Sequence, residues 1–212
     1  MNDWEALIDL VANRSSLLTT ALLIHIKLVL LAEIGGIAVA FPLAIAITYS
    51  RGAAKVVLRI FNIINTIPSL VLLGVAMSVF GIGFLPAVLA LFIYSIQPIL
   101  QNAYTGLMQI EPKYLKAARG MGMNERQILF KVKIPLAFPV ILSGIRISTV
   151  YIISWATLGA LIGAGGLGDL LYMGTSMNKM YYVIAGTIPT CVLAIVVNIF
   201  FSCLERASKH HL

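Results

Sequence analysis

The sequence contains few charged residues. Asp, Glu, Lys and Arg make up 11% of its 212 residues, whereas a soluble domain averages about 25%. Residues 60–110 carry no charge at all. A helix that crosses the hydrocarbon core of a membrane needs about 20 apolar residues, so this run is long enough for two crossings. The shortage of charge excludes an ordinary soluble domain and indicates a membrane protein.

Cysteines and catalytic motifs are also scarce. Cys191 and Cys203 are the two cysteines, and on one helix they would lie about 18 Å apart, which excludes a disulfide between them. The phosphate-binding pattern GxxxxGK[ST] is missing, and no nucleophile–base pair or metal-ligand cluster stands out. Residues 163–168 fit GxGxxG, but without the strand and helix that this dinucleotide motif requires. We therefore expect no catalytic residue, no metal and no cofactor in this chain.

Five segments have the length and apolar character of a membrane-spanning helix. They cover about residues 20–49, 59–80, 87–108, 139–161 and 183–204. This pattern predicts an all-α polytopic membrane protein with one domain, residues 1–212. Residues 1–19 would be an external N-terminal segment, 109–138 a cytoplasmic loop and 205–212 a cytoplasmic tail. Acidic residues stand near the N-terminus where a signal peptide would be basic, so none is expected.

The net charge of +7 comes from basic residues in alternate loops. They follow the first, third and fifth predicted spans: Arg51, Lys55, Arg59, Lys113, Lys116, Arg119, Arg126, Lys131, Lys133, Arg206 and Lys209. Cytoplasmic loops carry the excess of Lys and Arg in membrane proteins. We therefore expect the N-terminus outside and the C-terminus inside the cell. The basic balance then reflects insertion in a lipid bilayer and does not call for a nucleic-acid partner.

The cytoplasmic loop carries signals for a short first helix. Pro112 fits the first turn of a helix, where its missing N–H is not needed. Gly120 and Gly122 can both take the positive φ that ends a helix. A helix is therefore predicted from Pro112 to the glycines.

A second short helix is predicted directly after the glycines. Asn124, with Gln127 three residues later, resembles a capping box. Ile134-Pro135 would end this helix, because a proline disfavours the helical conformation of the residue before it. On spacing alone, a force-transmitting helix–glycine–helix elbow and an ordinary basic loop fit equally well.

This loop resembles the EAA motif of the membrane subunits of type I ABC importers. That motif reads Glu-Ala-Ala, three residues, Gly, nine residues and Ile-x-Leu-Pro, and residues 116–135 follow its spacing with Lys116 in place of the Glu. The resemblance implies the permease fold of that family, in which the loop inserts a coupling helix into a groove of a cytosolic ATPase. The implied contact residues are Lys116, Ala117, Ala118, Arg119, Gly120, Gly122, Val132, Ile134 and Pro135.

The similarity covers residues 28–206 and resembles the osmoprotectant branch, which serves glycine betaine, carnitine and choline importers. It is carried by segments at residues 62–70, 94–99, 104–106, 144–146, 156–158 and 162–168. The chain departs from that branch at Gln101, where Arg is common, and at Glu33, where an apolar residue would be expected. The resemblance implies a bacterial cytoplasmic membrane and three partners: a cytosolic ATPase dimer that binds ATP and Mg, a second permease subunit, identical or homologous, and an extracytoplasmic substrate-binding protein.

Polar side chains recur at helical spacing in the second, third and fourth predicted spans. Hydroxyls and amides suit a passage for a polar solute, and aromatic faces suit a quaternary ammonium group. The same residue types also make hydrogen bonds between membrane helices, which remains the alternative for each of them. The predicted passage-lining residues are Asn65, Ser69, Tyr94, Gln97, Gln101, Tyr151 and Trp155, with Asn62, Thr66, Thr105 and Ser148 on the same predicted faces.

Two ionisable residues fall within or next to predicted spans. Glu33 lies inside the first, where an acid is costly, and we expect a structural hydrogen bond or an interface position there, with proton coupling as the alternative. Arg146 lies near the start of the fourth and is expected to extend to the inner surface, with a role in the inner gate as the alternative. The residues favour an osmoprotectant permease. An amino-acid or methionine permease, or a membrane scaffold or receptor that transports nothing, remains open.

Overall fold

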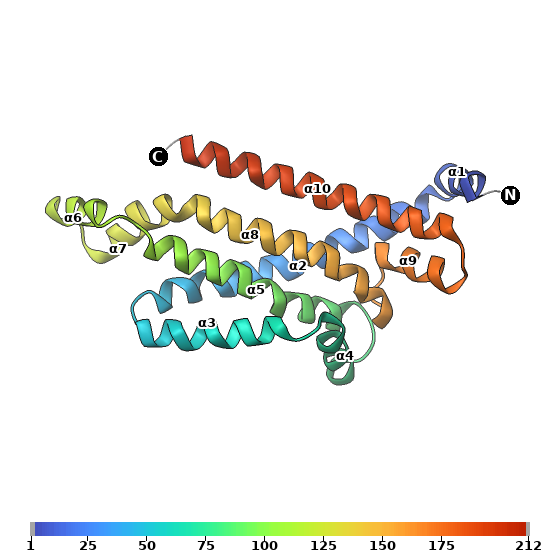
Figure 1. Cartoon of the computed structure of the whole chain (residues 1–212), viewed down its shortest axis with the longest axis horizontal. Helices are drawn as coiled ribbons and strands as arrows, with labels where there is room; N and C mark the ends of the chain where they lie inside the picture. Colours follow the sequence, from blue (N-terminus) through green and yellow to red (C-terminus); the bar gives the residue numbers. More distant parts are fainter. Residues whose placement is uncertain (1–2, 211–212) are drawn as a thin grey trace.

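The computed structural model describes residues 3–210, which form an elongated bundle of helices (Figure 1). Four helices in this part of the chain are long and apolar enough to cross a membrane: α2 (Ser15–Ile47), α5 (Phe84–Met108), α8 (Ile134–Ala156) and α10 (Met180–His210). A fifth crossing is present if α3 (Arg51–Thr66) and α4 (Ser69–Phe80) count as one broken span. The predicted all-helical membrane fold with about five spans is confirmed.

Helix α5 lies between α2 and α8 and forms the centre of the bundle. Its buried residues include alanines and isoleucines that pack against both neighbours, such as Ala103 and Ile99. Small residues let the backbones approach closely. A Cβ at Gly36 of α2 would lie 1.9 Å from Ser95 Oγ of α5. Close packing of this kind replaces the hydrophobic driving force that membrane helices lack among themselves.

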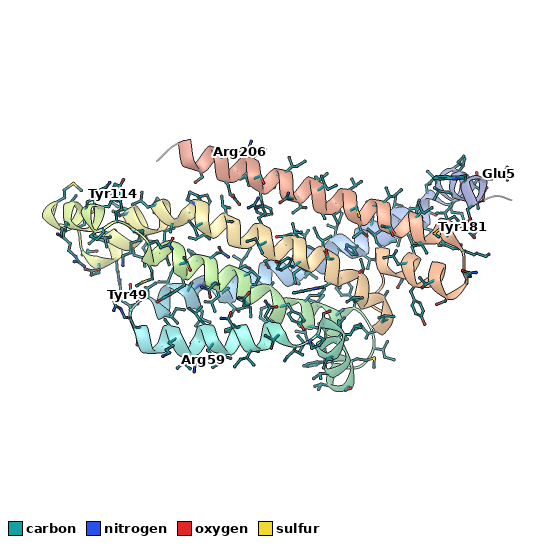
Figure 2. The ribbon with its side chains drawn as sticks, viewed as in Figure 1. Glu5, Tyr49, Arg59, Tyr114, Tyr181 and Arg206 are labelled. Atoms are coloured by element: carbon teal, nitrogen blue, oxygen red, sulfur yellow. The ribbon has the colours of Figure 1, made fainter. Side chains whose placement is uncertain are left out.

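The two ends of the bundle differ in what they carry. The turn between α2 and α3, the loop of α6 (Pro112–Gly120) and α7 (Glu125–Ile128), and the C-terminal end of α10 lie at one end (Figure 1). The short helices α1 (Asp3–Asn13) and α9 (Leu167–Ser176) lie at the other. In Figure 2, Tyr49 and Tyr114 mark the first end, and Glu5 and Tyr181 mark the second. The basic loops therefore gather at one end of the molecule.

The second span is not the single helix that the sequence predicts. It breaks after Thr66, and the axes of α3 and α4 differ by 93°. The residue before a proline is pushed out of the helical region, and Ile67, with φ −66° and ψ 130°, adopts that extended conformation before Pro68. The prediction that Asn62, Thr66 and Ser69 share one helical face is therefore wrong.

Smaller differences concern the ends of the first span and the segment before the last one. Helix α2 begins at Ser15, earlier than predicted, and α1 precedes it. The glycine-rich residues 163–182 contain α9, which packs on α10. Residues 1–2 and 211–212, which belong to the predicted external segment and cytoplasmic tail, lie outside the described residues.

Candidate transport passage and coupling loop

The first helix of the loop formed by α6 and α7 ends in a Schellman motif. The amide of Met123 donates to the Ala118 carbonyl at 3.1 Å, and the amide of Gly122 donates to the Arg119 carbonyl at 3.0 Å. This pair of bonds needs a left-handed residue at its centre, and Gly122 has φ +78°. The prediction that Gly122 takes a positive φ and ends the first helix is confirmed. The same prediction for Gly120 is wrong, because Gly120 is the last residue of α6.

The second helix of the loop begins as predicted. The Asn124 side chain accepts from the Gln127 amide at 2.9 Å, and the Gln127 side chain accepts from the Asn124 amide at 2.9 Å. This reciprocal pair is a complete capping box. It satisfies two backbone donors with side chains from the loop itself.

The sequence predicts that the second helix ends at Ile134-Pro135, but in the structure it continues. A π-helical segment, Leu129–Lys133, joins α7 to α8, and the Ile134 amide donates to the Leu129 carbonyl. Proline normally clashes with the carbonyl four residues earlier and lacks the N–H for that bond. The wider π turn accommodates both effects, so one helix of 38 residues runs from Glu125 to Ile162. The loop is thereby joined to a membrane span by continuous helix.

The surface of the loop combines exposed charge with exposed apolar side chains. Ala118 is buried, while Lys116, Ala117 and Arg119 around it are exposed. Met121, at the tip, is 69% exposed. A contiguous exposed apolar and charged surface is typical of a protein interaction site. Ala118 is thus the member of the Ala-Ala pair that holds the loop together.

The ion pairs on the loop join residues that are close in the sequence, and their side chains are exposed. Arg119 Nη2 lies 3.1 Å from Glu125 Oε1 and connects α6 to α7. The Lys113 ammonium lies 2.6 Å from a Glu111 carboxylate oxygen, and this hydrogen bond, followed by the attraction of the charge, raises the pKa of Lys113. Exposed pairs of this type contribute little to stability.

Three amides connect the broken span to α5. Gln97 Nε2 donates to Asn62 Oδ1 at 2.8 Å, and Asn65 Nδ2 donates to Gln97 Oε1 at 3.1 Å. Asn62 is exposed, and Asn65 and Gln97 are half-buried. We call these three residues the amide cluster. It lies on one face of the bundle, with polar atoms that are partly accessible from outside the chain.

Tyr94 supports the break between α3 and α4. Its hydroxyl donates to the Ile67 carbonyl at 2.5 Å, so it satisfies an acceptor that the break removes from the helical ladder. Its ring lies 4.6 Å from the ring of Trp155, whose other neighbour is Tyr151 at 5.6 Å. Tyr94 is only 2% exposed, whereas Tyr151 is 48% exposed. The sequence missed the role of Tyr94 because Ile67 is distant in the chain.

The structure brings together some of the predicted passage residues and separates others. Asn65 and Gln97 are in contact, and Tyr94, Tyr151 and Trp155 form one aromatic row. Ser69 begins α4 beyond the break. Gln101 reaches Thr105 on its own helix at 3.4 Å. Ser148 is fully buried, and its hydroxyl bonds to Glu33 of α2.

Ser148 belongs to a second polar group at the centre of the bundle. Its hydroxyl donates to Glu33 Oε2 at 2.9 Å, with the Ser95 carbonyl also near at 3.2 Å. The Ser95 hydroxyl lies 2.7 Å from the Phe92 carbonyl and 3.2 Å from the Ala32 carbonyl. We call Glu33, Ser95 and Ser148 the central carboxyl group. The structural hydrogen bond expected for Glu33 is confirmed, and it joins α2, α5 and α8.

The sequence predicts that Arg146 extends to the surface, but in the structure it contacts α10 instead. Its Nε lies 3.0 Å from Glu205 Oε1, and its Nη1 donates to Ser202 Oγ at 2.9 Å. Both partners belong to α10, and both charged side chains are largely buried. A buried cation in a membrane helix is stabilised by a partner of opposite charge. Within residues 3–210, no group of His, Cys, Asp and Glu side chains could hold a metal ion.

Comparison with known proteins agrees with this architecture. A family model described as binding-protein-dependent transport system inner membrane component matches residues 36–210. The choline transport system permease protein OpuBB of Bacillus subtilis is 42% identical over 182 residues, 86% of this chain and 84% of that protein. The carnitine transport permease protein OpuCB of Listeria monocytogenes is 41% identical over 85% of this chain and 83% of that protein.

A similar fold is found among solved structures. The MetNI methionine ABC transporter, in inward-facing conformations, matches with a TM-score of 0.83 over 93% of this chain and 98% of that chain, at 21% identity. An amino acid ABC transporter solved with histidines matches with a TM-score of 0.72 at 22% identity. At these identities the likeness concerns the fold alone.

Proposed function

Since the chain belongs to the family of binding-protein-dependent transport system inner membrane components, we propose that it carries quaternary-ammonium osmoprotectants across the membrane. As a multi-pass permease of an ABC importer, it is a transport component and not an enzyme. The observation that carries the substrate class is the similarity to relatives named for choline, carnitine and glycine betaine transport, at 41–42% identity over most of both chains. The sequence identity to a methionine transporter is 21%, about half of this value.

The amide cluster and the aromatic row are our candidate passage surface. A betaine has a cationic head, which aromatic faces attract, and a carboxylate, which amide N–H groups can bind. Gln97 and the exposed ring of Tyr151 offer these two chemistries on one face of the bundle. We propose that Asn65, Ser69, Gln97, Gln101, Tyr151 and Trp155 line the passage with the matching face of a second permease subunit, while Tyr94 supports them from behind.

We propose that the loop of α6 and α7 is the coupling element. The family implies an ATPase partner and a further permease subunit. The exposed loop residues, from Lys116 to Gly122 and from Val132 to Pro135, would contact the ATPase. Closure of the ATPases would displace Glu125, and the continuous helix to Ile162 carries Tyr151 and Trp155 with it. ATP and Mg would stay on the ATPase, and an extracytoplasmic binding protein would deliver substrate.

The orientation follows from the positive-inside rule and can be tested separately. We propose that the end with α6 and α7 faces the cytoplasm and the end with α1 and α9 faces outward. In a chain without Cys191 and Cys203, Lys179→Cys should react with a membrane-impermeant thiol reagent in intact cells, and Lys116→Cys should react only after permeabilisation. Labelling of Lys116→Cys in intact cells would contradict the orientation.

Uptake by the reconstituted complex tests the substrate class. With its ATPase, partner permease and binding protein, the chain should support saturable, ATP-dependent uptake of radiolabelled betaine, carnitine or choline. Methionine uptake without uptake of these three would overturn the proposal in favour of an amino-acid importer. Absence of any ATP-dependent uptake by an assembled complex would favour a membrane scaffold.

A point variant tests the passage surface. Gln97→Leu leaves the amides of Asn62 and Asn65 without their shared partner. The maximum uptake rate should fall, while the affinity of the isolated binding protein stays unchanged. Asn198→Leu, which removes an exposed amide from α10, is the matched control. Equal rates in the two variants would exclude the amide cluster from the passage.

A further inference from the structure

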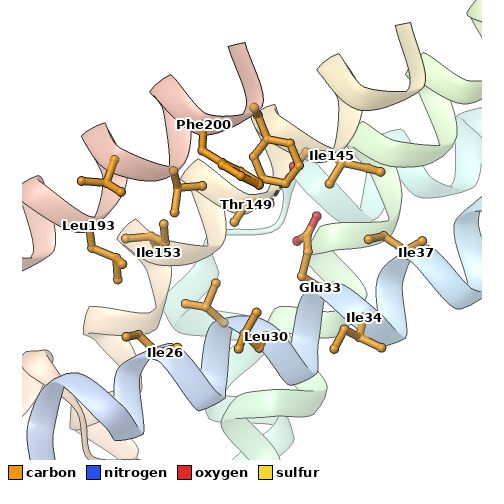
Figure 3. Close-up of a pocket in the computed structure, with 14 residues that line it drawn as sticks. Ile26, Leu30, Glu33, Ile34, Ile37, Ile145, Thr149, Ile153, Leu193 and Phe200 are labelled. Carbon is orange, nitrogen blue, oxygen red and sulfur yellow. Dashed lines mark hydrogen bonds between the residues drawn. The ribbon is translucent and has the colours of Figure 1, made fainter. Parts of the chain in front are cut away.

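A cavity of about 390 Å³ lies between α2, α8 and α10 (Figure 3). Its lining is aliphatic and aromatic except for Glu33 and Thr149, with Leu30, Ile153 and Phe200 among the walls. No residue of α3, α4 or α5 lines it. The cavity is therefore separate from the amide cluster, which lies between α3 and α5.

The cavity opens sideways from the bundle. Leu30, Ile34, Val196 and Phe200 line it and are each more than half exposed. In a membrane-spanning region, apolar side chains exposed in this way face lipid or another membrane helix. A ligand would therefore enter from the membrane and not from water.

One oxygen of Glu33 has no partner in this cavity. The whole residue is only 5% exposed, and Ser148 holds Oε2 while Oε1 makes no hydrogen bond. The Thr149 hydroxyl, the other polar group in the lining, donates to the Ile145 carbonyl at 2.8 Å. Figure 3 shows the carboxyl group pointing from α2 into the space toward α8 and α10. An unpaired buried polar atom is costly, so a hydrogen-bond donor from outside the chain would be stabilised here.

We propose that this cavity binds a membrane-soluble amphiphile with an apolar body and one hydrogen-bond-donating head, an ammonium or a hydroxyl, that meets Glu33 Oε1. The walls offer dispersion contacts to the body, and Ser148 holds the carboxyl in the orientation that presents Oε1. A molecule without a donor would gain the contacts but leave the oxygen unpaired. The site is distinct from the proposed substrate passage and does not depend on the identity of the substrate.

The bound amphiphile would contact both α2 and α10, two helices that pack only weakly on each other. The cavity separates α10 from α2, and both pack on α8. Because α8 continues into the coupling loop, a bound amphiphile would change how the three helices move together.

Photolabelling of the assembled transporter in native membranes tests this site. The probe is decylamine carrying a diazirine at the end of its chain, and labelled positions are mapped by mass spectrometry. Labels should concentrate on the cavity walls, such as Leu193 and Val197, and exceed those at Leu31, an exposed position of α2 outside the cavity. Unlabelled decylamine or decanol should compete about tenfold or more better than decane, since a hydrogen bond to a charged group is worth at least about 1.5 kcal/mol. If only decylamine competes in this way, the head is an ammonium. If only decanol does, the head is a hydroxyl.

Two variants keep the test decisive. Glu33→Gln retains an acceptor for Ser148 and should abolish the advantage of decylamine over decane. Val196→Phe narrows the opening without touching Glu33 and should reduce wall labelling, while the matched Ile195→Phe, an exposed residue outside the lining, should not. Equal competition by the three molecules in the wild-type complex would overturn the proposal. So would an absence of wall labelling, which would mean that a neighbouring protein segment fills the cavity.

Discussion

The loop of α6 and α7 and the central carboxyl group are both held by polar contacts, but over very different distances in the sequence. In the loop, Asn124 and Gln127 are three residues apart, and Arg119 and Glu125 are six apart. In the bundle, Ser148 reaches Glu33 across 115 residues and the Ser95 carbonyl across 53. The loop therefore closes on itself, whereas the bundle closes only when three helices are in place. Substitutions in the loop should change coupling, and substitutions in the bundle should change stability.

The largest stability effect is expected where α2 meets α5. Gly36→Val places a branched side chain where even a Cβ would lie 1.9 Å from Ser95 Oγ and 2.9 Å from Ser95 Cβ. Overpacking at the upper end of its usual range, about 3 kcal/mol, should lower the apparent melting temperature by roughly 6–12 °C, as measured by thermal unfolding in detergent. Gly74→Ala, on α4 with open space around its Cβ, is the control and should change it little. A small effect of Gly36→Val would mean that the helices separate easily.

The next effect should come from the hydrogen bond between α8 and α2. Ser148→Ala removes the hydrogen bond to Glu33 Oε2, which costs about 1–1.5 kcal/mol and lowers the apparent melting temperature by roughly 2–6 °C. Ser154→Ala, which removes an exposed hydroxyl bonded within its own helix, is the matched control. Combining Ser148→Ala with Glu33→Gln should give less than the sum of the single effects. Additive effects would argue against a direct interaction.

The same contrast explains what the sequence could predict. The Schellman glycine Gly122 and the capping pair Asn124 and Gln127 depend on neighbours within a few residues, and they were predicted correctly. The break before Pro68, with its 93° angle, lies in a segment that was predicted as one span, and there Tyr94 from another helix donates to the Ile67 carbonyl. Local residues cannot reveal such partners.

The errors have physical causes of the same kind. Pro135 was predicted to end a helix, but the π-helical turn before it lets the helix continue without the hydrogen bond that proline cannot donate. Arg146 was expected at the surface because its partner Glu205 lies far along the chain on α10. For the site, helical spacing put Tyr151 and Trp155 on one face, and their rings are in contact. Spacing named Asn65 and Gln97 on two separate spans but did not predict the hydrogen bond between them. It could not show that Ser148, two turns before Trp155 on α8, donates to Glu33 of α2.

The smallest stability effect is expected for the ion pair that joins α6 to α7. Arg119→Ala removes an exposed contact, and such pairs are worth about 0.2–1 kcal/mol. The melting temperature of the bundle should stay within about 2 °C of wild type. Glu125→Ala, which removes the other half of the pair, should behave in the same way. A larger drop in either variant would mean that the loop supports the bundle and would remove the contrast between the two regions.

The most direct measurement is the ratio of substrate taken up to ATP hydrolysed in the reconstituted complex carrying Gly122→Val, together with its melting temperature. Gly122 has φ +78° and open space around it, so the variant adds about 1–2 kcal/mol of backbone strain to the loop and no clash. Gly120→Val, also in open space but at the helical end of α6, is the control. Our account predicts a fall in the ratio for Gly122→Val alone, at an unchanged melting temperature. A wild-type ratio, or a loss of stability comparable to that of Gly36→Val, would contradict it.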